Sequence, residues 1–416
     1  MGLFFFPRGG SAHLARNLAN ALPRTGWDVT LLSGSRAPDG EARRFYDGLD
    51  VRPVEVEDLS YEAHLPNLDE AQAEEVTLTW TRALQSAGAA SADVLHLHHL
   101  TPLYEAAARV APNVPIVGHL HGTELLALEA IDKQPDRFAH GPAWAERMRR
   151  WAAGADTLII ASPSQVARAE TLLGITPQVI PNGYDPDCFY PRPVDRAAVW
   201  RRVLGPNARA GREALGAPEA PETANEPVLL YVGRFTAVKR LPLQIEAYAH
   251  ARTRFTRTAP LVLVGGYPGE CEGEHPADTI RRLGAEDVFL AGWHDHAELP
   301  EILAAGAAIV LPSVGEQFGQ VLVEGMATGL PAIAADDSGP SEIVRDGETG
   351  WLVTPDDARS LADALVEAVN RPDERLRRGL NAREDVAARF TWPVLAERVA
   401  GALDATMLRL GAAATP

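Results

Sequence analysis

Cysteine is scarce in this chain, because only Cys188 and Cys271 occur among its 416 residues. Two cysteines so far apart in sequence give neither a disulfide framework nor the paired spacing of a structural zinc site. Disulfide bonds form in oxidising compartments, so this composition favours a protein of a reducing compartment. We therefore expect a cytoplasmic location.

Long apolar runs are also missing from the sequence. No stretch approaches the roughly 18 to 20 consecutive apolar residues that a membrane-spanning helix needs. The apolar run at residues 3–6 is shorter than the apolar core of a signal peptide, and no basic amphipathic helix is evident. We therefore expect neither export nor a stable association with membranes.

Basic residues are outnumbered in this chain. There are 39 lysines and arginines against 56 aspartates and glutamates, which gives a formal net charge of -17. Nucleic acids and anionic lipid surfaces both bind basic faces, so neither is expected as a partner. Lysine itself is nearly absent, because Lys133 and Lys239 are the only two. An anionic ligand would therefore need a local group of positive charges.

Short apolar runs alternate with helical periods along most of the sequence. This alternation is typical of parallel sheets covered by helices. It occurs in two series, separated by residues 186–227, a stretch rich in Pro, Ala, Arg and Glu that has little to bury. The predicted strands are residues 3–6, 28–32, 94–98, 116–119, 158–161 and 178–180 in the first series, and 228–232, 261–264, 288–290, 308–311, 332–335 and 351–353 in the second.

We therefore predict an α/β protein with two doubly wound, Rossmann-like domains that face each other across a cleft. The first domain is expected at residues 1–185 and the second at 228–390, followed by a C-terminal helix at 391–416 that crosses back and packs on the first domain. Residues 186–227 are interpreted as a linker or insertion with a mobile tip at 217–227. Ligands of such sheets bind beyond the carboxyl ends of the strands, so the motifs at these positions are the most informative.

Two glutamates follow the predicted strand at 308–311. Glu316 lies in a loop, and Glu324 lies in a helix predicted to begin near Gly319. The unpaired amides and the positive dipole end of this helix suit a phosphate. Glu324 is flanked by apolar residues, and a buried carboxylate needs donors such as the two hydroxyls of a ribose. The alternative is a solvated Glu316 and a salt-bridged Glu324.

A second motif follows the first strand of the second series, where Gly233 and Arg234 precede Lys239, with four residues between Arg234 and Lys239. The guanidinium of Arg234 offers a planar fork for phosphate oxygens, and the ammonium of Lys239 is a compact charge that can lie between two phosphates. The alternative is a solvated basic loop.

Histidines gather at the ends of two predicted strands in the first series, at His96, His98, His99, His119 and His121. A zinc site is one interpretation, but no H-E-x-x-H motif and no cysteine pair accompanies them. Histidines that only cap loops are another.

Paired glycines, Gly9 and Gly10, follow the first predicted strand. A glycine loop at this position can place backbone amides beside a phosphate or a sugar oxygen. An ordinary strand-to-helix turn is the alternative interpretation.

These motifs occur together with Gly329-Leu330-Pro331 and Asn182-Gly183 in an order that resembles glycosyltransferase family 4, which comprises retaining enzymes of the GT-B fold. The resemblance spans nearly the whole chain and is loosest at residues 36–91 and 186–227. Pro340 stands where the family usually has a second glycine, so the match is weaker in that loop.

The resemblance implies roles for individual residues. Glu316 would bind the donor sugar and Glu324 the ribose. Arg234 and Lys239 would bind the diphosphate, and His121 would lie at the reactive carbon of the sugar. The catalytic set is thus Arg234, Lys239, Glu316 and His121; further donor-binding residues are Gly9, Gly10, Gly233, Phe318, Gly319, Gln320 and Trp293, and the acceptor-side residues are His96, His98 and Arg149. His119 stays an alternative to His121, and Trp293 could equally be a structural aromatic.

We expect a retaining glycosyltransferase that moves a sugar from a nucleoside-diphosphate sugar, most readily a UDP- or GDP-sugar, to a small soluble acceptor. Negative charge grows on the phosphate as the anomeric bond breaks, and Arg234 and Lys239 would stabilise it. No Asp-x-Asp motif stands at a convincing strand end, so we expect no metal and no cofactor besides the co-substrate. Retention fits a front-face transfer in which the departing phosphate oxygen takes the proton of the acceptor.

Three other functions share parts of this pattern. A nucleotide-sugar 2-epimerase would bind the same donor without an acceptor. A phosphorylase-like enzyme would need a pyridoxal lysine in the second domain, where Lys239 is the only lysine. A non-catalytic sugar-binding protein has the same two-lobed plan, but the periplasmic examples are exported.

Overall fold

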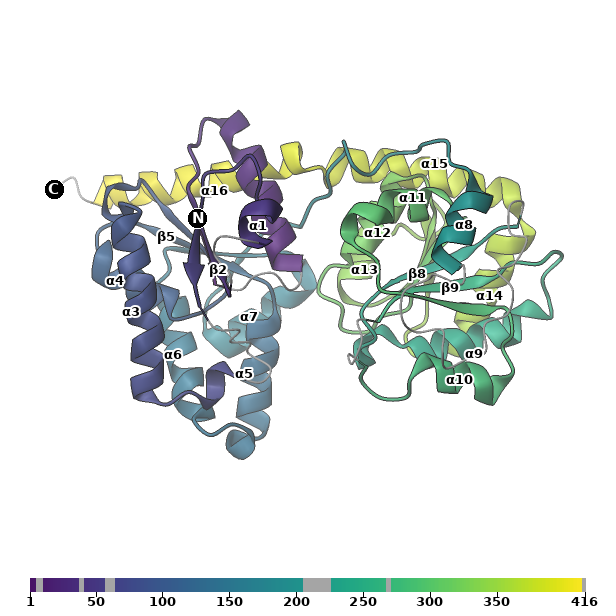
Figure 1. Cartoon of the computed structure of the whole chain (residues 1–416), viewed down its shortest axis with the longest axis horizontal. Coiled ribbons are helices and arrows are strands. Elements are labelled where there is room, and N and C mark those ends of the chain that lie inside the picture. The colour runs from purple at the N-terminus through teal and green to yellow at the C-terminus, as the bar shows by residue number, and fades with distance from the viewer. Residues whose placement is uncertain (5–9, 37–40, 57–63, 205–225, 267–270, 414–416) are drawn as a thin grey trace. The chain divides into compact units, whose positions relative to one another are not determined.

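The computed structural model describes residues 1–4, 10–36, 41–56, 64–204, 226–266 and 271–413. The chain divides into two compact units, one of residues Met1–Asn182 with Trp392–Pro416 and one of residues Gly183–Thr391. Each unit contains one parallel sheet with helices packed on it (Figure 1). The sequence prediction of two α/β units, each with a parallel sheet, is confirmed.

The first unit is built on a seven-stranded parallel sheet of order β3-β2-β1-β4-β5-β6-β7. Its strands are β1 (Gly2–Leu3), β2 (Leu31–Ser35), β3 (Val51–Glu55), β4 (Leu95–His98), β5 (Ile116–Leu120), β6 (Thr157–Ile160) and β7 (Gln178–Val179). Its helices are α1 (Gly10–Ala21), α2 (Glu41–Phe45), α3 (Glu70–Ser86), α4 (Leu103–Val110), α5 (Thr123–Lys133), α6 (Gly141–Ala153), α7 (Val166–Leu173) and α16 (Trp392–Ala413).

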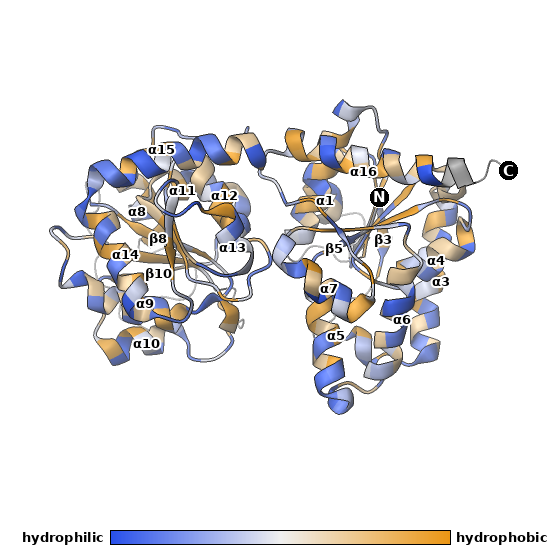
Figure 2. Cartoon of the chain, turned by 180° about the vertical axis from the view of Figure 1, so that it is seen from behind, coloured by the Kyte–Doolittle hydropathy of each residue, from blue (hydrophilic) through white to orange (hydrophobic). Residues whose placement is uncertain are grey.

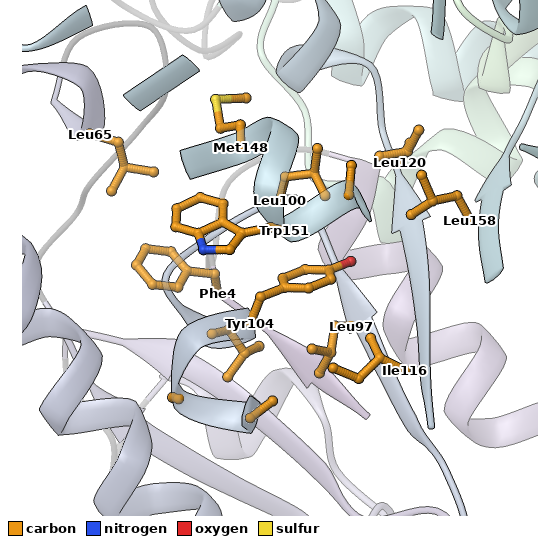
Figure 3. Close-up of a cluster of buried hydrophobic side chains, with 14 of the residues drawn as sticks. Phe4, Leu65, Leu97, Leu100, Tyr104, Ile116, Leu120, Met148, Trp151 and Leu158 are labelled. Carbon is orange, nitrogen blue, oxygen red and sulfur yellow. The ribbon is translucent and has the colours of Figure 1, made fainter. Parts of the chain in front are cut away.

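Side chains along β5 and β6 point alternately to the two faces of the sheet, and each face has its own hydrophobic core. Ile116 and Leu158 point into a cluster with side chains of α4 and α6, shown in Figure 3. Val117 and Ile159 belong to a cluster on the opposite face of the sheet, with α1 and α16. Alternate residues of a strand share a face, and His96 of β4 is opposite Val117 of β5. His96 and His98 therefore lie on the same face of the sheet as Val117.

The C-terminal helix packs on the first unit, as expected. The side chains of Trp392, Leu395 and Val399 on α16 are buried with Leu14 and Leu18 of α1. A polar contact adds to this packing, since the hydroxyls of Thr157 and Thr406 lie 2.7 Å apart.

The sequence prediction missed one strand and shifted another in the first unit. Strand β3 contains Pro53 and lies at the edge of the sheet, where the missing N–H of proline is tolerated, and its alternation is weak. Strand β2 lies three residues further along the chain than predicted. Its second half contains Ser33 and Ser35, which are buried in the sheet but, being polar, do not look like residues of a buried strand.

The second unit is built on a six-stranded parallel sheet of order β10-β9-β8-β11-β12-β13. Its strands are β8 (Leu229–Gly233), β9 (Leu261–Gly265), β10 (Val288–Gly292), β11 (Ala308–Leu311), β12 (Ala332–Ala335) and β13 (Gly350–Val353). Its helices are α8 (Arg196–Leu204), α9 (Leu241–Arg252), α10 (Pro276–Leu283), α11 (Leu299–Ala304), α12 (Gln320–Ala327), α13 (Ser338–Ile343), α14 (Ala358–Asn370) and α15 (Pro372–Arg389).

The sheet of the second unit is apolar and its helices are amphipathic. Figure 2 shows orange strands between helices that carry blue residues, most clearly on α15. Helix α9 packs against α10 and α14, and α12 packs against α11 and α15. Both faces of the central strands are covered, as the continuous apolar runs predict.

Part of the predicted linker is an ordered piece of the second unit. Helix α8 lies within the range 186–227, and its Trp200 and Val203 are buried with 1% and 0% exposure. The composition of the range concealed two helical turns that bury an apolar face. The predicted tip lies outside the described residues, apart from Glu226 and Pro227.

No helix among the described residues is both long enough and apolar enough to cross a membrane.

Candidate functional site

Loops after neighbouring strands bring the predicted donor residues together in the second unit. Strands β8 and β11 are adjacent and parallel, so their carboxyl ends lie at the same edge of the sheet. Arg234 and Lys239 follow β8, and Glu316 follows β11. The backbone N–H of Val314 donates to the carbonyl of Val238 at 3.0 Å, which ties the two loops together.

The ammonium of Lys239 and the carboxylate of Glu316 form a direct ion pair. Their side chains are only 17% and 18% exposed, respectively. Two opposite charges held close together in a partly dry site interact more strongly than a surface pair. The ends of two adjacent strands thus bring together a cation and a carboxylate that can accept from hydroxyls, and the two charges neutralise each other.

Arg234 is exposed at the start of the same loop. The Tyr231 hydroxyl donates to the carbonyl of Arg234 at 2.6 Å and so fixes the backbone at the end of β8. Burial first, and the nearby Glu316 carboxylate second, raise the pKa of Tyr231 well above its ordinary value. The phenol therefore stays a donor at neutral pH. Gly233, the last residue of β8, completes this turn.

The loop that carries Glu316 is held from outside by the segment that opens α13. The N–H of Gly339 donates to the carbonyl of Glu316 at 2.9 Å. The carboxylate of Asp337 accepts from the N–H of Gly315 at 2.6 Å. A Cβ at Gly339 would lie 2.5 Å from the Cα of Phe318, which is backbone and cannot move aside cheaply. Pro340, the departure noted in the sequence, follows this contact without disturbing it.

Substitution of Gly339 by alanine tests this support. We expect Gly339→Ala to displace the loop that carries Glu316, to lower the free energy of unfolding by about 1 to 3 kcal/mol and to reduce enzymatic turnover. Gly401→Ala is a matched control, because a Cβ at that helical position would meet no described atom within 4 Å apart from its chain neighbours and the nearby backbone of its own helix. Urea denaturation and turnover are measured on both variants. If both variants behave like the wild type, the glycine contact is not needed.

Helix α12 begins directly after this loop. Gly319 is its N-cap residue with φ of 95°, a conformation that glycine adopts without strain. The first amides of α12 are therefore presented at the same edge of the sheet as Lys239. The ring of Phe318 is only 5% exposed and packs edge-on against Phe390 at 5.7 Å between ring centres. The structure thus places the ring of Phe318 among buried side chains, and its donor-binding role stays a prediction.

Glu324 is 4% exposed on α12, as its apolar neighbours predict. Its Oε1 lies 3.0 Å from Nε2 of His296 and 3.2 Å from Nε2 of Gln320. The same Gln320 amide donates to the carbonyl of Gly183 at 2.8 Å. Both hydrogens of that amide thus have acceptors in the protein. The structure thus shows Gln320 in contact with Glu324, and its donor-binding role stays a prediction.

The loop after β10 contributes residues that the sequence prediction missed. Trp293 follows the strand and is 38% exposed, so its ring is partly accessible to a ligand. The side chain of His294 is 5% exposed, with Nδ1 3.4 Å from Oε2 of Glu298, and neither ring nitrogen has a hydrogen-bond partner within the described residues. His296 reaches Glu324. The Trp-His-Asp-His sequence at a strand end was the signal available for both histidines.

The histidines of the first unit form a stack at the carboxyl ends of β4 and β5. The rings of His98 and His119 are 5.2 Å apart and nearly parallel, and those of His119 and His121 are 5.1 Å apart. Nε2 of His96 lies 3.3 Å from Nδ1 of His119, and Nδ1 of His98 lies 3.0 Å from Nε2 of His121. His99 pairs with a buried carboxylate, that of Glu124, at 2.9 Å.

Burial keeps the stacked imidazoles neutral. It lowers the pKa of His119 to about 4, and it lowers the pKa of His96, His98 and His121 well below the ordinary value, with a smaller effect of the neighbouring histidines. A neutral His121 can accept a hydrogen bond on one ring nitrogen and donate from the other. Among the described residues, no group of three or more His, Cys, Asp or Glu side chains is placed to hold a metal ion.

The stack makes stability depend on pH in a defined direction. The unfolded chain has histidines with a pKa of about 6.5, above the folded values, so it binds more protons below that pH. We expect the free energy of unfolding to fall as the pH is lowered from about 6.5 toward 4. Urea denaturation at pH 7, 6 and 5 measures this slope. His119→Asn removes one of the titrating groups and should flatten the slope, whereas an unchanged slope would contradict the role of the stack.

Arg149 does not join these histidines. Its guanidinium donates to the carbonyl of Leu172 at 3.0 Å and to Asp132 at 2.6 Å. Arg149 lies in the second half of α6, which ends at Ala153. Just after this helix, the N–H of Asp156 donates to the carbonyl of Ile116, the first residue of β5, so this end of α6 is near the start of the strand. The histidines lie at the other end of the strands. The structure therefore does not bring Arg149 together with the histidines, because helices run antiparallel to the strands that they connect, and its acceptor-side role stays a prediction.

The predicted glycine loop is only partly visible. Gly9 lies outside the described residues. Gly10 is the first residue of α1 and is exposed, with open space where a Cβ would be.

Comparisons with known proteins agree with these features. The family model for glycosyl transferases group 1 matches residues 217–385, and the model for Glycosyltransferase Family 4 matches residues 8–188. The chain is 30% identical to the D-inositol 3-phosphate glycosyltransferase of a Nocardioides species over 366 residues, which is 83% of this chain and 74% of the relative.

Two further similarities differ in extent. The chain is 33% identical over 178 residues to the alpha-D-kanosaminyltransferase of Streptomyces kanamyceticus, covering 42% of this chain. It spans about half the length of that relative, 45%. The crystal structure of Anabaena HepE in complex with UDP and glucose has a TM-score of 0.69 and 22% identity, with 97% of this chain and 99% of that chain covered, and it shows the GT-B fold. The chain therefore belongs to glycosyltransferase family 4.

Proposed function

We propose that this protein transfers a sugar from a nucleoside-diphosphate sugar to a small soluble acceptor, with retention of anomeric configuration and without a metal ion, in the cytoplasm. The observation that carries the proposal is the ion pair of Lys239 and Glu316 at adjacent strand ends. The pair supports the proposal because an ammonium that can bind a phosphate lies beside a carboxylate that can accept from sugar hydroxyls. The N-terminus of α12 and the buried Glu324 extend the site toward a phosphate and a ribose.

The chemistry assigned to the site is electrostatic. As the bond between the anomeric carbon and the phosphate oxygen breaks, negative charge grows on that oxygen, and the Lys239 ammonium and Arg234 guanidinium stabilise it. The acceptor oxygen forms the new bond to the anomeric carbon on the same face. Its proton passes to the departing phosphate oxygen, so no protein nucleophile is needed. Glu316 holds sugar hydroxyls in position.

The first unit would supply the acceptor side. His121 has a neutral imidazole whose Nε2 lies 3.0 Å from Nδ1 of His98. The backbone N–H of His121 donates to Oε1 of Glu124 at 3.2 Å, which fixes the main chain at this residue. A neutral, oriented imidazole suits a sugar hydroxyl better than a mobile cation does. His98 contacts this ring from β4, and His96 packs against His98.

Names of relatives narrow the donors and acceptors to be tested. One relative is named D-inositol 3-phosphate glycosyltransferase and another alpha-D-kanosaminyltransferase. Each name contains a small polar molecule, a cyclitol phosphate or a sugar. UDP-sugars are the first donors to test, because HepE of the same fold was crystallised with UDP and glucose.

The proposal is tested by incubating the protein with UDP-, GDP-, ADP- and TDP-sugars and a panel of cyclitols and sugars, in the presence of EDTA. Release of nucleoside diphosphate that depends on an acceptor is expected, and NMR of the product should show the anomeric configuration of the donor. Inversion would exclude the front-face step. Formation of an epimer from the donor alone would favour a 2-epimerase, and loss of turnover in EDTA would contradict metal independence.

A further inference from the structure

One oxygen of the Glu324 carboxylate is held by two side chains from different elements. His296 lies in the single turn at residues 296–298 and approaches Oε1 with Nε2 at 3.0 Å, and Gln320 donates to the same oxygen at 3.2 Å from within α12. Within the described part of the chain, Oε2 receives no hydrogen bond. A buried carboxylate has about four acceptor positions, so the second oxygen keeps its capacity for a ligand.

His296 is itself held in place. Its ring packs edge-on against Phe189, with ring centres 5.3 Å apart. The turn that carries it is closed by a capping box, in which the N–H of Asp295 donates to Glu298 at 3.1 Å and Asp295 caps the turn in return. The ring is 36% exposed, so it borders solvent while Glu324 is almost fully buried. A constrained imidazole can therefore fix the orientation of the carboxylate.

Orientation matters for this carboxylate because a free Glu side chain has several rotamers. Restricting it to one of them when a ligand binds costs conformational entropy. With Gln320 alone, the carboxylate would have a single side-chain contact, which comes from its own helix, α12. Contacts from both His296 and Gln320 on one oxygen restrict the rotation of the group. The remaining oxygen is thereby presented in one direction.

We propose that His296 is a positioning residue, which orients Glu324 so that its free oxygen accepts from the ribose hydroxyls of the donor nucleotide. This inference rests on the proposed function, in which Glu324 binds the ribose. His296 acts through Glu324 and sets the preference for a ribose over a sugar that lacks these hydroxyls. It does not act on the bond that is broken.

The test compares nucleotides with and without ribose hydroxyls. UDP, GDP and ADP and their 2′,3′-dideoxy analogues are titrated by calorimetry into the wild type, His296→Ala, His296→Gln and His250→Ala. His250 is exposed in the last turn of α9 and serves as the matched control. We expect His296→Ala to weaken binding of the preferred ribonucleotide about tenfold, as for loss of a hydrogen bond to a charged group, and to change dideoxy binding less than about twofold.

The variants separate positioning from a general structural role. His296→Gln offers an amide donor to the carboxylate and should restore most of the ribose preference. In turnover assays, His296→Ala should raise the KM for the donor and leave kcat nearly unchanged. A purely structural role would lower the affinity for both nucleotides alike and would show in the melting temperature, and that result would overturn the inference.

Failure of this inference is distinguishable from failure of the proposed function. If the wild type binds none of the three nucleotides, the proposed function itself fails. If Glu324→Ala abolishes the ribose preference while His296→Ala retains it, Glu324 keeps its role and only the positioning role of His296 is overturned.

Discussion

Replacement of Lys239 by alanine is expected to lower the rate of sugar transfer on the order of 100-fold or more. The loss follows because Lys239 is the partly buried cation at the end of β8, and a preorganised charge at a departing phosphate is among the largest contributions to catalysis. Initial rates at saturating donor and acceptor measure it. Lys239→Arg should retain part of the rate, because a guanidinium keeps the charge but not the compact shape of the ammonium.

The chain offers a matched control for this experiment in its only other lysine. Lys133 is 75% exposed at the end of α5, where it forms a surface pair with Glu129. Lys133→Ala should leave the rate unchanged. A rate within about threefold of the wild type for Lys239→Ala would place Lys239 outside the reaction. Melting curves of the variant show whether the loss of its partner leaves Glu316 destabilising the fold.

The two glutamates are expected to fail in different ways. Glu324→Ala should weaken the binding of a nucleoside diphosphate about tenfold or more, because it removes the buried carboxylate proposed to accept from the ribose. Glu316→Ala should lower kcat and change nucleotide affinity little, because its carboxylate is proposed to hold the sugar. Calorimetry with the nucleotide and steady-state kinetics measure the two effects on the same preparations.

The pattern of effects decides this prediction. If Glu324→Ala binds the nucleotide as tightly as the wild type, the ribose assignment is wrong. If Glu316→Ala weakens nucleotide binding as strongly as Glu324→Ala does, the two carboxylates do not have separate roles.

Much of the fold could be predicted from the sequence, because a strand buried on both faces needs a continuous apolar run. Strands such as Leu261–Gly265 and Ala308–Leu311 have that property. Strand Val51–Glu55 lies at a sheet edge, contains proline and alternates only weakly, so its sequence does not distinguish it from a loop. Helix α8 was concealed by the unusual composition around it, although Trp200 and Val203 have helical spacing.

The site was predictable in part, for a physical reason. Residues at the carboxyl ends of adjacent parallel strands meet wherever the strand order brings them, so Lys239 and Glu316 could be assigned to one site but not to one ion pair. The contact of His296 with Glu324 joins loops whose approach depends on side-chain packing, as does the burial of Phe318. Arg149 lies away from the histidines because helical direction, and not sequence proximity, decides which end of a strand a residue approaches.

The most direct test is a crystal structure of the protein soaked with the nucleoside diphosphate that binds most tightly in the calorimetric panel. The proposed site predicts the diphosphate beside Lys239 and the N-terminus of α12, with a ribose hydroxyl within hydrogen-bond distance of Glu324 Oε2. A nucleotide bound elsewhere, or a ribose that makes no contact with Glu324, would contradict it.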